Sequence, residues 1–308
     1  MTSLDLGSLV LGGNVFGWTS DRDESFAVLD AFVAGGGRSI DTADSYSQWV
    51  PGNSGGDSEA IIGEWLASRG ARDAVEIHTK VSSKTDRQGL SPATIAAAVD
   101  DSLRRLQTDH IDLYYAHRDD PDVDQADYVG AFDALVTAGK VREVGASNFS
   151  AARLSSALDT AAAAGLTPFT VAQDKWSLVE RGLETTRLPT LVDRGIVQLP
   201  YSSLASGFLT GKYRPGTTVP SARAQAAGGY LERAGSLDLL DTLDAVAAAH
   251  DTSVTAVSLA WLRVQPTVGA PIASARTLDQ VQPLLDSMTL TLTDDDLARL
   301  DQSSAALG

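Results

Sequence analysis

Ser39-Ile40-Asp41-Thr42-Ala43-Asp44-Ser45-Tyr46, at residues 39–46, carries a short apolar run into a polar segment with a carboxylate and a phenol five residues apart. Two later apolar runs also lead into ionisable side chains, the first at Lys80 and the second at His117. An α/β barrel carries its chemistry at the C-terminal ends of its strands. The sequence therefore predicts a parallel α/β barrel that brings Asp41, Tyr46, Lys80 and His117 together at one rim.

The rest of the chain alternates between strand-like and helix-like segments, which predicts βα units and a parallel sheet. Apolar residues at consecutive positions suit parallel strands that are covered on both faces. The expected fold class is α/β, a (β/α)8 TIM barrel that forms one domain over residues 1–308, with extra helices and long loops at the C-terminal face. The eight expected strands cover residues 9–11, 38–40, 75–79, 111–115, 141–145, 169–172, 196–201 and 268–272.

Amphipathic segments between these runs predict helices. Ser91 and Pro92 suit the N-cap and first turn of one of them, and Asp57 or Ser58 suits the N-cap of another. A glycine-rich loop is expected at 48–56 and a long loop at 212–229, and long loops in compact domains are usually functional or disordered. The expected helices cover 23–33, 58–68, 91–106, 124–138, 150–164, 183–194, 237–250, 277–287 and 293–303, with an extra one within 251–264.

Composition excludes several classes of function. The 308 residues carry a net charge of −16, which argues against binding to nucleic acid or to an anionic membrane. The chain has no cysteine, so disulfides, thiolate catalysis and zinc–cysteine sites are impossible. No His/Glu cluster has the spacing of a metal site. The start lacks the regions of a signal peptide and no run is long enough to span a membrane, so a cytoplasmic protein is expected.

The four ionisable residues suit proton transfer to a carbonyl oxygen. A tyrosine phenol titrates near 10, and a lysine ammonium beside it lowers that pKa. An aspartate can hold the lysine, and a histidine can hydrogen-bond the substrate oxygen, so the set forms a proton donor for a developing alkoxide. Such a site needs a hydride source, usually a nicotinamide. Taken singly, each residue also fits a structural role: Asp41 as a cap, Tyr46 in packing, Lys80 solvated and His117 in the core.

Several motifs resemble the aldo-keto reductase family, in order and over almost the whole chain. They are Ser39 to Tyr46, His78-Thr79-Lys80, Tyr114 to His117, Gly145 to Phe149, and Tyr201 to Tyr213. The resemblance implies a small-molecule aldehyde, ketone or alcohol substrate. It also implies that Tyr46 is the general acid, that Lys80 lowers the pKa of Tyr46, that Asp41 pairs with Lys80, and that His117 orients the carbonyl.

The same resemblance implies the residues of a cofactor site. Trp176 would stack on the nicotinamide, and Arg276, before a helix, favours NADP(H) over NAD(H), which stays possible. Ser203 replaces the family's usual proline, and Pro283 and Leu284 replace a Glu-Asn pair that contacts adenine. The full expected set is Ser147, Asn148, Gln173, Trp176, Tyr201, Ser202, Leu204, Ala205, Gly207, Lys212, Arg223, Ile272, Ser274, Arg276 and Gln280.

The expected substrate contacts are Asn14, Trp18 and Trp49, although core packing is an equal alternative for Trp18. Two other functions fit the same residues. One is a sugar or alcohol dehydrogenase that works with NAD(P) in the oxidative direction. The other is a nucleotide-binding regulatory subunit with little turnover. The sequence leaves the oligomeric state open.

Overall fold

Eight parallel strands form one sheet in this computed structural model, which describes residues 4–305 and 307. The order β10-β1-β2-β3-β6-β7-β8-β9 follows the chain apart from β10, which pairs with β1. The last strand also contacts the segment that follows β9, because the Ile272 amide donates to the Pro200 carbonyl at 2.8 Å. The expected (β/α)8 barrel is therefore confirmed. The strands are β1 (Val10–Gly12), β2 (Ser39–Asp41), β3 (Glu76–Val81), β6 (Ile111–Ala116), β7 (Val141–Ser147), β8 (Val171–Gln173), β9 (Val197–Gln198) and β10 (Ile272–Ala273).

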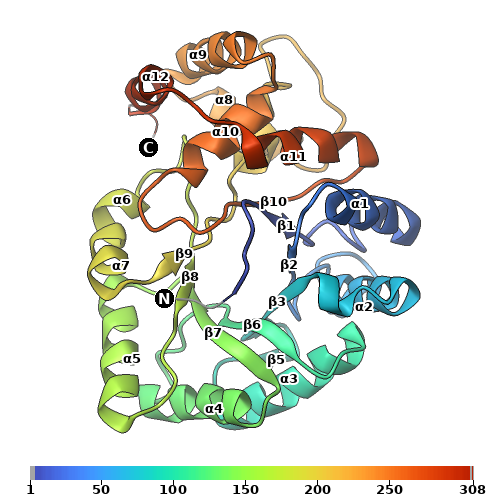
Figure 1. Ribbon diagram of the computed structural model, residues 1–308, viewed down its shortest axis with the longest axis vertical. Coiled ribbons are helices and arrows are strands. Elements are labelled where there is room, and N and C mark those ends of the chain that lie inside the picture. The colour runs from blue at the N-terminus through green and yellow to red at the C-terminus, as the bar shows by residue number, and fades with distance from the viewer. Residues whose placement is uncertain (1–3, 306, 308) are drawn as a thin grey trace.

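Helices surround these strands, with α8–α12 gathered on one side and α4 and α5 on the opposite side (Figure 1). None of the helices within the described part of the chain is long and apolar enough to cross a membrane. The helices are α1 (Arg22–Ala34), α2 (Asp57–Arg69), α3 (Pro92–Leu106), α4 (Gln125–Thr137), α5 (Ala151–Ala164), α6 (Leu183–Thr186), α7 (Leu188–Arg194), α8 (Ala224–Leu231), α9 (Ser236–Ala249), α10 (Val254–Arg263), α11 (Val281–Thr289) and α12 (Asp294–Ser304), with 3-10 turns η1 (Arg72–Ala74), η2 (Ala205–Thr210) and η3 (Leu278–Gln280).

Two helix starts show how local sequence sets the boundaries. The Ser91 side chain accepts a hydrogen bond from the Thr94 amide, and α3 begins at the next residue, Pro92, as predicted. The start of α2 differs from the prediction, because Gly56 is its N-cap rather than Asp57 or Ser58. Gly56 has a φ of +86°, and a β-carbon there would clash with the Arg105 side chain. Only glycine suits this position.

Five segments depart from the expected elements. The predicted helix at 183–194 is broken into α6 and α7, since Pro189 lacks the amide that would continue it. The loop at 212–229 contains the start of α8, and the helix at 277–287 begins with the η3 turn. A short hairpin, β4 (Ser83–Lys84) and β5 (Arg87–Gln88), follows β3 and was not expected. The eighth strand lies at Ile272–Ala273, because Val268 makes only a single bridge to Gln198.

The core has an inner and an outer part. Val10, Leu113, Val171 and Ile272 form one buried cluster and come from β1, β6, β8 and β10. Strands spaced around the whole sheet can share contacts only inside it, so this cluster fills the barrel. Side chains alternate along a strand, so Tyr114 points outward and packs against Phe132 of α4, with ring centroids 5.8 Å apart. The filled interior leaves the strand ends as the place for a site.

Candidate active site

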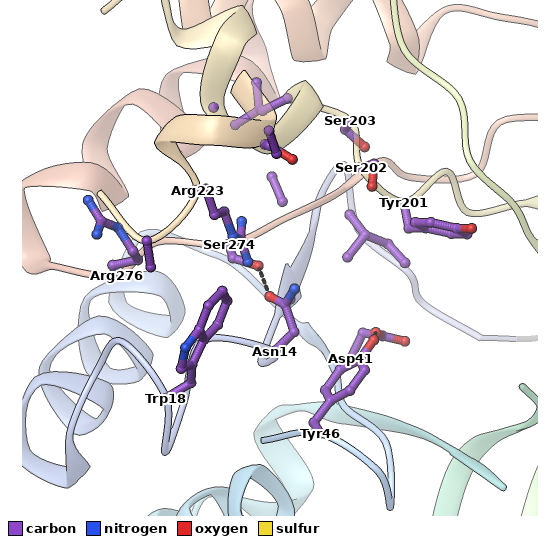
Figure 2. Close-up of a pocket in the computed structure, with 18 of the residues that line it drawn as sticks. Asn14, Trp18, Asp41, Tyr46, Tyr201, Ser202, Ser203, Arg223, Ser274 and Arg276 are labelled. Carbon is purple, nitrogen blue, oxygen red and sulfur yellow. Dashed lines mark hydrogen bonds between the residues drawn. The ribbon is translucent and has the colours of Figure 1, made fainter. Parts of the chain in front are cut away.

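A cavity of about 650 Å³ lies over the C-terminal ends of the strands (Figure 2). Most of the residues expected in the site line it, although they come from segments spread over the whole chain. The expected residues that line it are Asn14, Trp18, Asp41, Tyr46, His117, Ser147, Asn148, Gln173, Tyr201, Ser202, Leu204, Gly207, Lys212, Arg223, Ile272, Ser274, Arg276 and Gln280.

Lys80 is fully buried behind the cavity lining and connects two of the lining residues, Asp41 and Tyr46. Its Nζ donates to Asp41 Oδ2 at 2.6 Å, to the Thr42 carbonyl at 2.7 Å and to Tyr46 Oη at 3.1 Å. The three donated bonds use the full capacity of an ammonium group. Lys80 comes from β3 and Asp41 from β2, so the pairing of these neighbouring strands positions the contact.

Asp41 is held from its other side by Gln173 of β8. The Gln173 Nε2 donates to Asp41 Oδ1 at 2.8 Å across the barrel. Both carboxylate oxygens are therefore bonded to donors on different strands, which keeps the Asp41–Lys80 pair in one geometry. Burial lowers the pKa of Lys80, and the charge and hydrogen bond of Asp41 oppose that effect.

Burial raises the pKa of Tyr46 well above its ordinary value, and the nearby Asp41 carboxylate raises it further. These effects outweigh any lowering by the Lys80 ammonium, which donates to the phenol at 3.1 Å, so the expectation that Lys80 lowers this pKa stays a prediction. The Tyr46 hydroxyl therefore stays protonated at physiological pH and is able to donate a proton.

His117 faces Tyr46 across the site, with ring centroids 6.1 Å apart. Burial lowers the pKa of His117 well below its ordinary value, and the charges of Lys80 and Arg118 add to this. The imidazole is therefore neutral. Its Nδ1 is buried and has no hydrogen-bond partner among residues 4–305 and 307. A neutral imidazole still donates one N–H, which suits hydrogen bonding to an uncharged substrate oxygen.

The other end of the cavity is cationic. Lys212, Arg223 and Arg276 all line it, and none of the three forms an ion pair with a carboxylate in the described part of the chain. Burial lowers the pKa of Arg223, and the charge of Arg276 lowers it further. Arg223 also lies over the Trp18 ring, with its guanidinium carbon 5.4 Å from the centroid, as Figure 2 illustrates. Cations gathered without counter-charges in a chain of net charge −16 point to an anionic ligand.

The turn between β9 and Lys212 lines the cavity through Ser202, Ser206 and Gly207. Ser202, Ala205, Ser206 and Gly207 all have positive φ values, between 47° and 96°. Three of these are not glycine, and such left-handed residues cost free energy that the surrounding structure must offset. Successive turns of this kind gather N–H groups into an anion-binding concavity. The segment is thus suited to the phosphates of a nucleotide.

The family model for the aldo/keto reductase family matches residues 8–305. The chain belongs to the aldo-keto reductase family. Protein tas of Escherichia coli is 31% identical over 97% of this chain and 94% of its own length. Norsolorinic acid reductase B of Aspergillus parasiticus is 30% identical over 98% of this chain and 81% of its own length. The NADP(+) aryl-alcohol dehydrogenase of Phanerodontia chrysosporium is 28% identical over 98% of this chain and 82% of its own length. This aldo-keto reductase is therefore an oxidoreductase that uses a nicotinamide cofactor and a small-molecule substrate.

Four residues expected in the site do not line the cavity of this aldo-keto reductase: the buried Lys80 described above, and Trp176, Ala205 and Trp49. Trp176 is fully buried, and its Nε1 donates to Glu184 at 3.0 Å. Ala205 is also fully buried. Trp49 stands beside the cavity rather than in its lining and is 49% exposed. Tyr201 is the aromatic residue that does line the cavity after β9, with its Oη donating to Asn148 Oδ1 at 2.8 Å.

Arg118 and Asp44 belong to this reductase's site region, although the sequence motifs do not point to a role for either. Arg118 lines the cavity directly after His117, and its position two residues beyond the end of β6 is the available signal. Asp44 lies inside the opening motif and is 1% exposed. Neither of its carboxylate oxygens has a hydrogen-bond partner in the described residues. Burial raises the pKa of Asp44 to about 8, and the neighbouring Glu59 adds to the increase.

The Asp44→Asn variant is expected to be more thermostable than the wild type at alkaline pH. The folded protein holds the Asp44 proton up to about pH 8, whereas the unfolded chain releases it near 3.8, so stability falls as pH rises between these values. An amide cannot ionise, so the advantage of the variant should grow from about pH 4 to about pH 8 and then level off. Each kcal/mol gained shifts the melting temperature by about 2–4 °C. A difference in melting temperature that is constant with pH would contradict the assignment.

Proposed function

We propose that this protein reduces aldehydes or ketones to alcohols with NADPH, and that Tyr46 protonates the carbonyl oxygen. One observation carries the proposal. The Tyr46 hydroxyl lies 3.1 Å from the Lys80 ammonium in a cavity whose other end holds Lys212, Arg223 and Arg276. A proton donor and an anion-binding region thus share one space, as a carbonyl substrate and a phosphate-bearing cofactor require.

The residues present fit a nicotinamide dinucleotide. Ser147, Asn148 and Gln173 would hold the carboxamide end, and the ring of Tyr201 rather than Trp176 would stack on the nicotinamide. The turn at 202–207 and Lys212 would hold the pyrophosphate. Arg276 and Gln280 would hold the adenosine 2′-phosphate end, with Arg223 between the two. When bound, the nicotinamide supplies the hydride that no side chain can provide.

The chain's own residues supply the proton and hold the substrate oxygen. The neutral His117 donates a hydrogen bond that orients the carbonyl. The Tyr46 hydroxyl gives its proton to the oxygen as negative charge develops there. The Lys80 ammonium then stabilises the phenolate, and the Asp41 carboxylate keeps Lys80 in place. Because Tyr46 is buried and its pKa is raised, the protonated form needed for reduction is present at neutral pH.

The oxidative direction is a second candidate, favoured by the relative that is named an aryl-alcohol dehydrogenase with NADP(+). The same Tyr46 would then accept a proton from the alcohol. Rates measured in both directions with both cofactors separate the two candidates. A regulatory subunit without turnover is disfavoured, because Asp41, Lys80 and Tyr46 are all in contact.

The Arg276→Ala variant tests the proposed preference for NADPH. Loss of a charge-assisted hydrogen bond should raise the KM for NADPH at least about tenfold, while the KM for NADH changes little. Arg299→Ala is the matched control, because Arg299 is exposed on α12 and its loss removes the same charge away from the cavity. Equal increases for the two cofactors would count against a 2′-phosphate contact at Arg276.

A further inference from the structure

We propose that Arg118 binds an anionic group on the substrate, so that the preferred substrates are aromatic aldehydes or ketones bearing a carboxylate or a similar anion. This inference rests on the proposed carbonyl reduction and assigns its substrate class. It starts from the observation that Arg118 lines the same cavity as Tyr46 and His117.

The position of Arg118 is set by the segment that follows β3. The Arg118 carbonyl accepts a hydrogen bond from Ser82 Oγ at 3.4 Å, and the Arg118 Nε donates to Ser83 Oγ at 3.0 Å. Both the backbone and the start of the guanidinium are therefore anchored. The two terminal nitrogens remain to bind a planar anion in the fork geometry that suits a carboxylate.

The Arg118 guanidinium has no carboxylate partner within the described part of the chain. The nearest acidic residues in sequence are used elsewhere. Asp119 pairs with Arg153 at 2.6 Å, and Asp120 accepts from the Leu90 amide at 2.8 Å. An exposed arginine without a counter-ion, in a chain of net charge −16, offers its charge to a ligand in the cavity.

Arg118 is separate from the cations proposed for the cofactor. It follows β6, whereas Lys212 and Arg223 follow β9 and Arg276 follows β10. In the sheet order, β6 stands four places from β10 and three from β9, so Arg118 lies across the rim from them. The charge of Arg118 nevertheless lowers the pKa of His117, although burial and the charge of Lys80 have larger effects. The guanidinium thus lies beside the proposed carbonyl position and away from the phosphate end.

Aromatic side chains lie next to Tyr46, with Trp18 in the lining of the cavity and Trp49 beside it. Trp18 and Trp49 meet edge to face with centroids 5.6 Å apart, and Trp49 meets Tyr46 in the same way at 6.3 Å. Trp49 is half exposed, which is unusual for so large an apolar side chain. A flat aromatic ring fits against such faces. The combination of these side chains with Arg118 selects an aromatic carbonyl compound that also carries negative charge.

The test compares para- and meta-carboxybenzaldehyde with the matching methylbenzaldehydes, which have the same ring and no charge. Wild type, Arg118→Met and Arg118→Lys are assayed with NADPH. The wild type should prefer the carboxylates. Arg118→Met should lower that preference in kcat/KM at least about tenfold, the size of a lost charge-assisted hydrogen bond, while turnover of the methyl compounds is retained. Arg118→Lys should retain part of the preference, since it keeps the charge and loses the fork.

Two further arms keep the outcomes distinct. Arg104→Met removes a charge from an exposed pair on α3 and should leave the preference unchanged. Calorimetry with para-carbamoylbenzoate and benzamide measures the anion site on the NADP-loaded protein without turnover. If the wild type binds the carboxylate more tightly than benzamide and Arg118→Met does not, the anion site is supported even if no aldehyde is reduced. A failure to reduce any aldehyde would overturn only the proposed reduction. An equal loss for charged and neutral aldehydes, or carboxylate binding that survives in Arg118→Met, overturns the proposal for Arg118.

Discussion

Tyr46→Phe is expected to lower kcat for carbonyl reduction by about 10²–10⁴-fold, the usual contribution of a positioned general acid. The substitution removes only the hydroxyl that contacts Lys80 at 3.1 Å. The ring contacts with Trp49 and His117 remain, so the shape of the site is kept. NADPH should therefore bind to the variant about as tightly as to the wild type, which fluorescence titration measures.

Tyr114→Phe is the matched control for this variant. Tyr114 lies on the outer face of β6, and its buried hydroxyl has no hydrogen-bond partner among the described residues. Removing it should leave turnover nearly unchanged, so a large loss in Tyr46→Phe alone assigns the effect to the site. If Tyr46→Phe retains near-normal turnover over a panel of aldehydes and ketones, Tyr46 is not the proton donor.

Lys80→Met is expected to be both inactive and less stable. The substitution leaves the Asp41 carboxylate buried without its ion pair, and breaking a buried pair in this way costs about 3–5 kcal/mol. It also removes the charge that stabilises a phenolate at Tyr46, so turnover should fall by about 10²-fold or more. Denaturant unfolding and steady-state rates measure the two effects separately.

The double variant Asp41→Asn with Lys80→Met separates charge burial from catalysis. Without the carboxylate there is no unpaired charge, so much of the lost free energy of unfolding should return. Activity should not return, because the phenol still lacks its ammonium. A double variant as unstable as Lys80→Met would show that the charge of Asp41 is not what destabilises the single variant.

The barrel could be predicted from sequence because its signals are local. Apolar runs ending in Asp41, Lys80 and His117 give the order of the strands, and the Ser91-Pro92 pair gives a helix start. The boundaries that were missed depend on contacts between distant segments. Gly56 becomes the cap of α2 because Arg105 of α3 occupies the space beside it, and such crowding leaves no pattern in the sequence.

The sequence predicted which residues lie in the site better than it predicted the pKa values and charge partners of those residues. A motif places Tyr46 near Lys80, but the direction in which the Tyr46 pKa shifts depends on burial and on the Asp41 carboxylate. Trp176 looked suitable for stacking by residue type, although β8 carries it into the core. The sequence does not show that the guanidinium of Arg118 lacks a carboxylate partner, because this depends on Asp119 and Asp120 bonding to other residues.

The central claim is that a hydride and a proton reach one carbonyl group in the cavity beside Tyr46. The most direct measurement follows deuterium from NADPH labelled at the hydride-donating carbon of the nicotinamide, with wild type and Tyr46→Phe compared by mass spectrometry of the product. We predict deuterium on the carbinol carbon of the alcohol formed by the wild type, and almost no labelled alcohol from Tyr46→Phe in the same reaction time. Unlabelled alcohol from the wild type, or equal amounts of labelled alcohol from both proteins, would contradict the account.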